Sequence, residues 1–354
     1  MDVLTYQCPN CGAALTFNEA TQHWDCKYCL SSFTLEDLEK DGQKQEPEKT
    51  APASDAEKTV EEPEQGEMRE YTCPQCGAHI VTDATTAASF CVFCGNATIF
   101  PEQLSGSFRP ELLIPFQVKK DAAQAAFKRL CKGKPLLPRD FCAPDRIEKI
   151  TGVYVPFWLY DCATNSYMTA NAQRVHTWSD SRYRYTRTDH FRIERGGTMD
   201  FDKIPADGSS KMDDALMDAI EPYDMKKLVD FSTAYLSGFM AERYDEDSEK
   251  VFPRASTRIR NTVEQTLRNT ISGYASVQVT QNDVQVQRQS TKNVLLPVWM
   301  LMSRYKGKEY LFAMNGQTGK LVGNLPVSIP KAFAWAAGIF AGVSLLLYLG
   351  GMLI

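Results

Sequence analysis

The residues best suited to chemistry in this sequence are eight cysteines, arranged as two quartets with the same spacing. In each quartet two Cys-x-x-Cys pairs are separated by fourteen residues, and each cysteine of the second quartet lies 65 positions after its counterpart. Each pair holds two sulfurs on one side of an ion, and two pairs complete a tetrahedron of thiolates, which suits zinc. The predicted ligands are Cys8, Cys11, Cys26 and Cys29 in the first quartet, and Cys73, Cys76, Cys91 and Cys94 in the second.

We expect two Zn²⁺ ions per chain, both with a structural role. All four ligands of each quartet are protein sulfurs, so neither ion keeps an open position for substrate or water. A ribbon of roughly thirty residues is too small to fold by apolar burial alone, so metal binding supplies most of its folding energy. Iron bound as in rubredoxin stays an open alternative. Disulfides are disfavoured, because the opening residues show no basic and apolar leader to an oxidising compartment.

The quartets predict a zinc ribbon at residues 1–38 and a second at 71–100, each built on a short hairpin. Residues 39–70 between them are acidic, and Val60 and Met68 are their only large apolar side chains. Such a segment cannot form a core and like charges extend it, so we expect a disordered linker. On this interpretation ribbon one moves freely relative to ribbon two, and each unfolds without disturbing the other.

Residues 108–325 have the pattern of a globular α+β domain with a mostly antiparallel sheet. Three apolar runs of strand length each contain a proline, which predicts edge strands or bulges; they are Leu112–Val118, Val153–Tyr160 and Val294–Met302. Strand-like alternation also covers Ser181–Arg195. Helices are predicted at Asp121–Leu130 and Ala255–Tyr274, with two more stretches in Lys211–Asp245 broken near Pro222.

Two hairpins are expected in the last part of this domain. One joins Val277–Thr280 to Val284–Arg288, and the other joins Glu309–Met314 to Lys320–Val322 around a Gly-containing turn. That turn does not satisfy the phosphate-loop pattern. The cysteines outside the quartets, Cys131, Cys142 and Cys162, lack metal-ligand spacing and are expected to be reduced thiols.

The sequence ends in 23 residues without a charge, 332–354. As a helix they would be about 34 Å long, enough to cross a hydrocarbon core of about 30 Å. We therefore expect a tail-anchored, single-pass protein of the cell membrane, with its N-terminal domains in the cytoplasm and Lys331 on the inner face. Ala334, Gly338 and Gly342 lie four residues apart, a spacing that permits homo- or hetero-association of the span, although it also occurs in simple anchors.

The charge pattern bears on partners. The net charge is −5, and ribbon one has Lys27 as its only basic residue; nucleic-acid binding, which depends on basic residues, is therefore disfavoured. The segment from Arg174 to Arg195 is different, with six arginines, three acids and interleaved aromatic residues. Two interpretations stay open there: a half-buried strand with arginines on its wet face, or a surface for anionic lipid or an acidic partner.

No motif for catalysis is present: we find no nucleophile elbow and no His-Glu-x-x-His sequence, and we expect no enzyme. Four features of the chain point to a family: the double ribbon, the Tyr154–Asp161 strand, the Met314–Lys320 turn with Gly323, and the terminal apolar segment. Together they resemble a family of Gram-positive bacterial membrane-anchored proteins with TFIIB-type zinc ribbons. Members of that family are often labelled as relatives of the primosomal helicase, although neither a phosphate loop nor a helicase core is found here.

The resemblance implies an adaptor found alongside SPFH (flotillin-like) proteins and phage-shock factors of membrane stress. Our interpretation is a membrane scaffold that recruits protein partners through its cytoplasmic ribbons and α+β domain. The alternative is a membrane-tethered nucleic-acid-binding or replication-linked factor. In fold class we therefore expect a multidomain chain: two small four-cysteine zinc ribbons, an α+β domain with mostly antiparallel sheet, and one C-terminal transmembrane helix.

Overall fold

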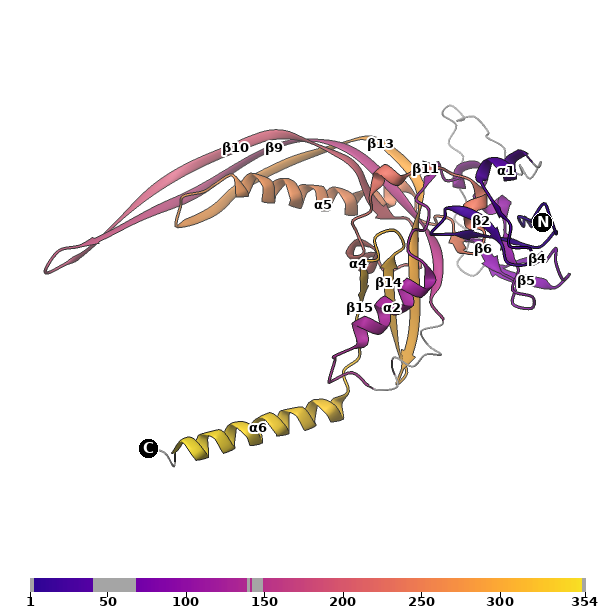
Figure 1. Cartoon of the computed structure of the whole chain (residues 1–354). Coiled ribbons are helices and arrows are strands. Elements are labelled where there is room, and N and C mark those ends of the chain that lie inside the picture. The colour runs from indigo at the N-terminus through magenta and orange to yellow at the C-terminus, as the bar shows by residue number, and fades with distance from the viewer. Residues whose placement is uncertain (1–2, 41–67, 139–140, 142–148, 352–354) are drawn as a thin grey trace.

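A computed structural model describes residues 3–40, 68–138, 141 and 149–351 of the chain. The expected fold class is confirmed: the chain has two four-cysteine clusters, mixed sheets that are largely antiparallel, and one apolar C-terminal helix. Figure 1 shows a lobe that holds the N-terminus, a central body, a long curved arm, and the C-terminal helix α6 (Ile329–Gly351). The arm and α6 leave the body toward the same side.

Three long strands build the arm and continue into the body. β9 (Thr151–Ser179) and β13 (Ser276–Tyr305) pair antiparallel over almost their whole length, and β10 (Arg184–Asp207) pairs with the other edge of β9. Helix α5 (Ser248–Asn269) covers one face of this sheet, as Figure 1 shows. Its buried apolar stripe includes Ile259, Val263 and Leu267, which gives the arm a narrow core of its own.

Shorter elements complete the body around the near halves of β9 and β13. The strands are β8 (Leu112–Leu113), β11 (Val229–Asp230), β12 (Met240–Glu242), β14 (Lys308–Asn315) and β15 (Leu321–Gly323), and the helices are α2 (Lys120–Cys131) and α4 (Asp214–Ala219). Short 3₁₀ turns are η1 (Pro101–Leu104), η2 (Gly106–Phe108), η3 (Met225–Lys227) and η4 (Thr233–Leu236). Phe116, Phe239 and Trp299 pack at the centre of the body core.

Each cysteine quartet lies in a small antiparallel unit. Ribbon one contains β1 (Leu15–Asn18), β2 (His23–Cys26) and β3 (Ser32–Phe33), followed by helix α1 (Leu35–Lys40). Ribbon two contains β4 (Met68–Thr72), β5 (His79–Asp83), β6 (Thr86–Phe90) and β7 (Ala97–Ile99). β6 pairs with β12 of the body, so the second half of ribbon two is part of the ten-stranded sheet.

Ribbon one is packed against the body, and the expectation that it moves freely is wrong. Trp24 is 1% exposed, and its indole nitrogen donates a hydrogen bond of 2.8 Å to the Ala234 carbonyl. The ring of Phe17 lies edge-on to Tyr235, with centroids 5.3 Å apart. The two ribbons also touch through an antiparallel bridge between Leu4 and Ile99. Burial of these aromatic side chains fixes ribbon one on the body. Residues 41–67 of the expected linker lie outside the described part.

The expectation that the proline-containing strands lie at edges or bulges is wrong for β9 and β13, because both are central strands and neither Pro156 nor Pro297 lies at a register shift. Their prolines are tolerated because each stands where a neighbouring ladder ends. The Pro156 carbonyl accepts from Gly208 just beyond the last β10 pair, and the Pro297 carbonyl accepts from Gly316 just beyond the last β14 pair. In a strand, the backbone nitrogen and the carbonyl of one residue point toward the same neighbouring strand. Each proline nitrogen therefore points toward the neighbour whose pairing has just ended, where the missing N–H group costs no hydrogen bond.

Several predicted elements need correction, and others are confirmed. The hairpin expected at Asn282 is absent, because β13 runs straight through it and pairs with Met168 and Tyr167 of β9. Of the two helices expected in Lys211–Asp245 only α4 forms; a cis Glu221–Pro222 bond follows it, and the rest of the range holds short 3₁₀ turns and the strands β11 and β12. Helices α2 and α5 and the β14–β15 hairpin are confirmed, with α5 starting earlier, at Ser248. β4 begins at Met68, inside the range expected for the linker.

The three cysteines outside the quartets have different outcomes. Cys131 is disulfide-bonded rather than reduced, Cys162 is a buried free thiol, and Cys142 lies outside the described residues.

Candidate metal centres

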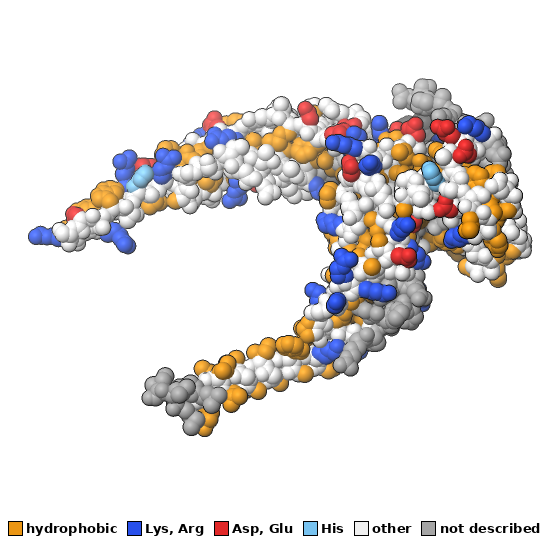
Figure 2. Space-filling view, in the orientation of Figure 1, with side chains coloured by type: hydrophobic (Ala, Val, Ile, Leu, Met, Phe, Trp, Pro, Cys, Tyr) orange, Lys and Arg blue, Asp and Glu red, His pale blue; other side chains and the backbone are white. Residues whose placement is uncertain are grey.

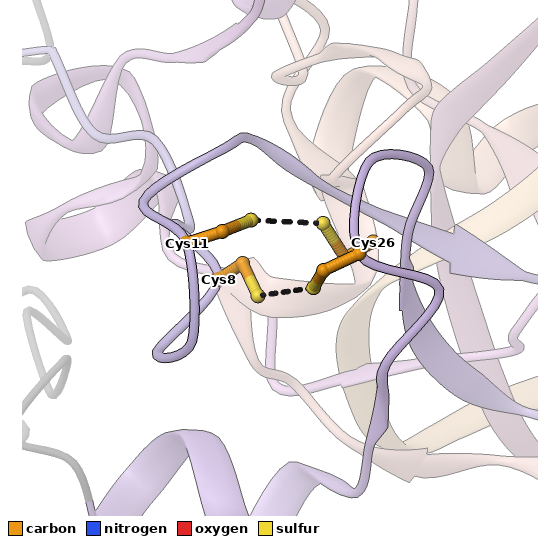
Figure 3. Close-up of side chains that lie close together, drawn as sticks. Cys8, Cys11 and Cys26 are labelled. Atoms are coloured by element: carbon orange, nitrogen blue, oxygen red, sulfur yellow. Dashed lines mark hydrogen bonds between the residues drawn. The ribbon is translucent and has the colours of Figure 1, made fainter.

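The structure brings together all eight predicted ligands, as two separate groups of four sulfurs. Within each group the ligand atoms lie within 4.8 Å of one another. In ribbon one the Sγ atoms of Cys8 and Cys29 are 3.4 Å apart and those of Cys11 and Cys26 are 3.5 Å apart. Figure 3 shows these side chains converging from two facing turns. In ribbon two both corresponding distances are 3.7 Å.

These distances fit a metal ion better than any direct bond between the sulfurs. A disulfide requires about 2.05 Å between the two sulfur atoms. A tetrahedron with zinc–sulfur bonds of about 2.3 Å has sulfur–sulfur edges of about 3.8 Å. Ribbon two matches this edge, and ribbon one is slightly tighter. Both groups can hold a tetrahedral ion, and in each the first cysteine of both pairs is buried and the second is exposed.

Each pair of cysteines is held by the same backbone turn. The first cysteine of the pair accepts a hydrogen bond at its carbonyl from the residue four positions later, and that residue has positive φ in all four turns. Three of the four are glycines, for which this conformation carries no steric penalty: Gly12, Gly77 and Gly95. The fourth is Leu30, with φ of 60°. A branched residue in this region costs roughly 1–2 kcal/mol.

Local hydrogen bonds prepare some of the sulfurs to bind as thiolates. Hydrogen bonds from the side chain and backbone of Ser31 lower the pKa of Cys29 to about 6 in the metal-free protein. Backbone amides, with that of Cys94 contributing most, lower the pKa of Cys91 to about 7, although some burial raises it. Metal ligation requires deprotonated cysteine, so these donors favour the binding form at Cys29 and Cys91, whereas hydrogen bonds with neighbouring thiols help to raise the pKa of Cys11 and Cys94 in the same groups.

We expect the purified full-length protein to carry two zinc ions per chain, because the two four-sulfur groups share no ligand. Elemental analysis of detergent-purified protein measures this directly. Iron in place of zinc would show the visible absorption of a thiolate-bound iron centre. A single ion per chain would contradict two independent sites.

The exposed ends of the two ribbons carry apolar residues that sequence reasoning did not single out. Tyr28 and Leu30 are 87% and 86% exposed in ribbon one, and Val92 and Phe93 are 84% and 72% exposed in ribbon two. All four lie in, or directly after, the second Cys-x-x-Cys pair of their ribbon. The sequence does contain one indication of this surface. Leu30 occupies a turn position that is glycine in the other three Cys-x-x-Cys turns. We call these four residues the knuckle residues.

The chain's C-terminal helix is the other candidate for function. In the described part of the chain, only α6 is long and apolar enough to cross a membrane, judged by length and composition. None of its Ile329–Tyr348 stretch is buried inside the protein. The helix begins three residues before the predicted span of 332–354, and residues 352–354 lie outside the described part.

Contacts with the body fix the root of α6. The Lys331 ammonium donates a hydrogen bond of 2.6 Å to the Leu137 carbonyl, and the Ser328 amide donates one of 2.8 Å to the Leu136 carbonyl. Beyond this root the helix makes no buried contact along its apolar surface. Such an exposed apolar helix needs a non-aqueous environment or a partner.

Comparison with known proteins gives one clear relationship. No family model matches the chain, and no solved structure matches it. A protein of Bacillus subtilis (strain 168) described as the uncharacterized protein YdjG is 40% identical over 347 residues, which covers 98% of this chain and 97% of that protein. Identity at this level over nearly the full length of both chains shows common descent and a common fold, and the chain belongs to the family of YdjG.

Proposed function

We propose that this protein is a membrane scaffold: α6 crosses the cell membrane, and the two ribbons with their attached body recruit a protein partner on the cytoplasmic side. The observation that carries the proposal is α6, an apolar helix of 23 residues with an unburied surface, joined to a well-packed folded body. Both metal groups consist only of protein thiolates, so the proposal assigns them no catalytic step.

The proposal includes zinc as the ion in both groups, with a structural role. The sulfur–sulfur distances support a tetrahedral ion of this size. Each ion would join the two turns of its ribbon, and so would fix the end of that ribbon. The knuckle residues are thereby held at the protein surface in one geometry.

Charge supports a cytoplasmic location for the body. Lys331 stands at the start of the apolar stretch, and Lys320 lies eleven residues before it. Basic residues close to the entry of a span favour the cytoplasmic side. A reducing cytoplasm also keeps the eight cysteines available as metal ligands.

The knuckle residues are the surface that we assign to partner binding. Large apolar side chains with more than 70% exposure are costly unless a partner covers them. Leu30 adds the cost of its backbone conformation, a strain that glycine at the same position would avoid. The resemblance described above suggests an SPFH (flotillin-like) protein as the partner.

The test replaces the knuckle residues in the full-length protein and measures crosslinking to partner proteins in native membranes. We expect Tyr28→Ser with Leu30→Gly, and separately Val92→Ser with Phe93→Ser, to reduce the crosslinked product severalfold while zinc content and melting temperature stay near wild type. Val81→Ser is the matched control, because this side chain is exposed on ribbon two outside the knuckles. Equal product in wild type and in both double variants would refute the assignment of this surface.

We also expect removal of residues 332–354 to release the protein from the membrane. About twenty apolar residues provide far more membrane affinity than exposed basic residues alone. Fractionation of cells that express the full-length and shortened chains measures the effect. A shortened chain that remains fully in the membrane fraction would show that another part of the protein is the main anchor.

A further inference from the structure

The end of the arm carries an ordered aromatic cluster that is about half exposed in the described part of the protein. Trp178 and Tyr185 are cross-strand partners in the β9–β10 hairpin, and their rings stack with centroids 5.6 Å apart. Tyr183 lies edge-on to Tyr185 at 6.3 Å. The three side chains are 52%, 41% and 64% exposed. They lie at the point of the arm farthest from the body (Figure 1).

Hydrogen bonds make this turn rigid. The Asp180 carboxylate accepts from the backbone amides of Arg182 and Tyr183, at 2.8 and 2.7 Å, and from the Tyr185 hydroxyl at 2.9 Å. Its negative charge is therefore engaged within the turn. A rigid cluster loses little conformational entropy when it meets another surface. We call residues 178–187 the arm tip.

Basic side chains surround the cluster. Within the described part of the chain the guanidinium groups of Arg182 and Arg184 form no ion pair, and Arg187 pairs with Asp189. Arginines farther from the tip are engaged by the arm itself: Arg174 lies over the rings of Phe191 and Tyr274. Figure 2 shows basic side chains gathered at the far end of the arm, in a chain whose net charge is −5. The free positive charge is thus concentrated where the aromatic rings are exposed.

We propose that the arm tip binds the anionic headgroups of the membrane that α6 enters. Tryptophan and tyrosine prefer the boundary between water and hydrocarbon, and arginine forms paired hydrogen bonds with phosphate. The arm and α6 leave the body toward the same side, so the arm tip lies on the side of the body where α6 would meet the membrane (Figure 1). This proposal goes beyond the scaffold function and rests on it for the presence of the membrane.

The chemistry of the arm tip also sets the depth of the contact. The arm tip is too polar to enter the hydrocarbon, because it contains Arg182, Arg184 and Arg187 with polar residues between them. Its three aromatic rings reach only the headgroup boundary. The tip therefore rests on the surface. Since the arm cannot enter the bilayer beside α6, seating the tip requires the helix to change its direction relative to the body, against the contacts of Ser328 and Lys331 that fix its root. Two separate contacts then fix the orientation of the body above the membrane.

The experiment measures quenching of Trp178 fluorescence by lipids with a spin label near the headgroup. Full-length protein is reconstituted into phosphatidylcholine vesicles with and without phosphatidylglycerol, and the Trp178 signal is the difference between wild type and Trp178→Phe. We expect Trp178 to be quenched on vesicles that contain phosphatidylglycerol. The quenching should be lost on vesicles without phosphatidylglycerol, and also at high salt. Arg182→Gln with Arg184→Gln is expected to abolish the quenching. Arg260→Gln with Arg268→Gln, which removes the same charge from the exposed face of α5, is expected to leave it unchanged.

The fluorescence of Trp335 in α6 separates this proposal from the scaffold proposal. Quenching of Trp335 by lipids labelled deep in the acyl chain, with no quenching of Trp178 on either vesicle, would overturn the arm-tip proposal and leave α6 as the anchor. No quenching of Trp335 would instead count against the membrane span. Equal Trp178 quenching on neutral and anionic vesicles would refute headgroup charge as the basis of binding.

Discussion

Replacing Cys26 with serine is expected to unfold ribbon one and to destabilise the body beneath it. Binding of a structural zinc ion is worth about 10–16 kcal/mol in small zinc domains, and loss of one of four thiolates removes most of that stabilisation. Trp24 lies two residues before Cys26 and is buried against the body. When ribbon one unfolds, the surface formed by Tyr235 and Phe239 becomes exposed to water. The damage therefore extends beyond the ribbon.

Hydrogen exchange of the full-length protein measures how far the damage extends. We expect zinc content to fall from two ions to one, and exchange to rise in residues 233–239 as well as in ribbon one. Cys162→Ser is the matched control, because this thiol is buried and belongs to neither quartet. It should leave both ions in place. Unchanged exchange at 233–239 in Cys26→Ser would show that ribbon one is an independent unit.

Arg254→Met is expected to destabilise the protein by about 3–5 kcal/mol, the cost of leaving a buried charge without its partner. Arg254 of α5 donates a hydrogen bond of 2.5 Å to the Asp207 carboxylate, which is 0% exposed, and it also pairs with Asp214 of α4. These contacts join α5, α4 and the end of β10 at the root of the arm. Denaturant unfolding of wild type and variant measures the difference in free energy.

The loss of stability caused by Arg254→Met should depend on pH. Burial raises the pKa of Asp207 to about 6, although Arg254 lowers it in part. Because this value lies above the usual value of about 4, the folded protein binds the proton more tightly, and the stability contributed by this carboxyl falls as pH rises from about 4 to about 6. Without Arg254 the pKa rises further, so the variant should lose more stability near about pH 7 than near about pH 5.

Two further variants of the same cluster test the cause. Asp207→Asn in the Arg254→Met background is expected to recover much of the loss, because it removes the unpaired charge. Arg260→Met, on the exposed face of the same helix, should cost little at either pH. A penalty for Arg254→Met that is the same at both pH values would show that lost packing, rather than the charge of Asp207, is responsible.

The sequence was sufficient wherever the signal was local. The two Cys-x-x-Cys pairs of each ribbon identify their ligands by spacing alone, because one turn fixes each pair. The uncharged C-terminal segment identifies α6, and the apolar stripe through Ile259 and Val263 identifies most of α5. In the ribbons and in α5 the residues that define the element also make its main contacts.

Contacts between distant segments could not be read from the pattern. Asn282 and Asp283 have the composition of a turn, yet β9 supplies partners that hold them in a continuous strand. Likewise, nothing near Trp24 in the sequence shows that its ring is covered by residues more than 200 positions later. The linker composition predicted a segment without a core, which for residues 41–67 lies outside the described part, and it carried no information about the surface that ribbon one contacts.

The continuity of β9 and β13 from the arm into the body has a mechanical consequence. Both strands pass from the arm to the body without a break, so the arm lacks a hinge at which it could pivot freely. A force applied at the far end of the arm acts along the direction of the strands. It loads the hydrogen bonds between neighbouring strands in shear, so that many of them resist the force at the same time. The same strands pair with β12, which holds β6 of ribbon two, and with β14. Tension applied at the far end of the arm is therefore delivered, along stiff strands, to the lobe that holds the two four-sulfur groups.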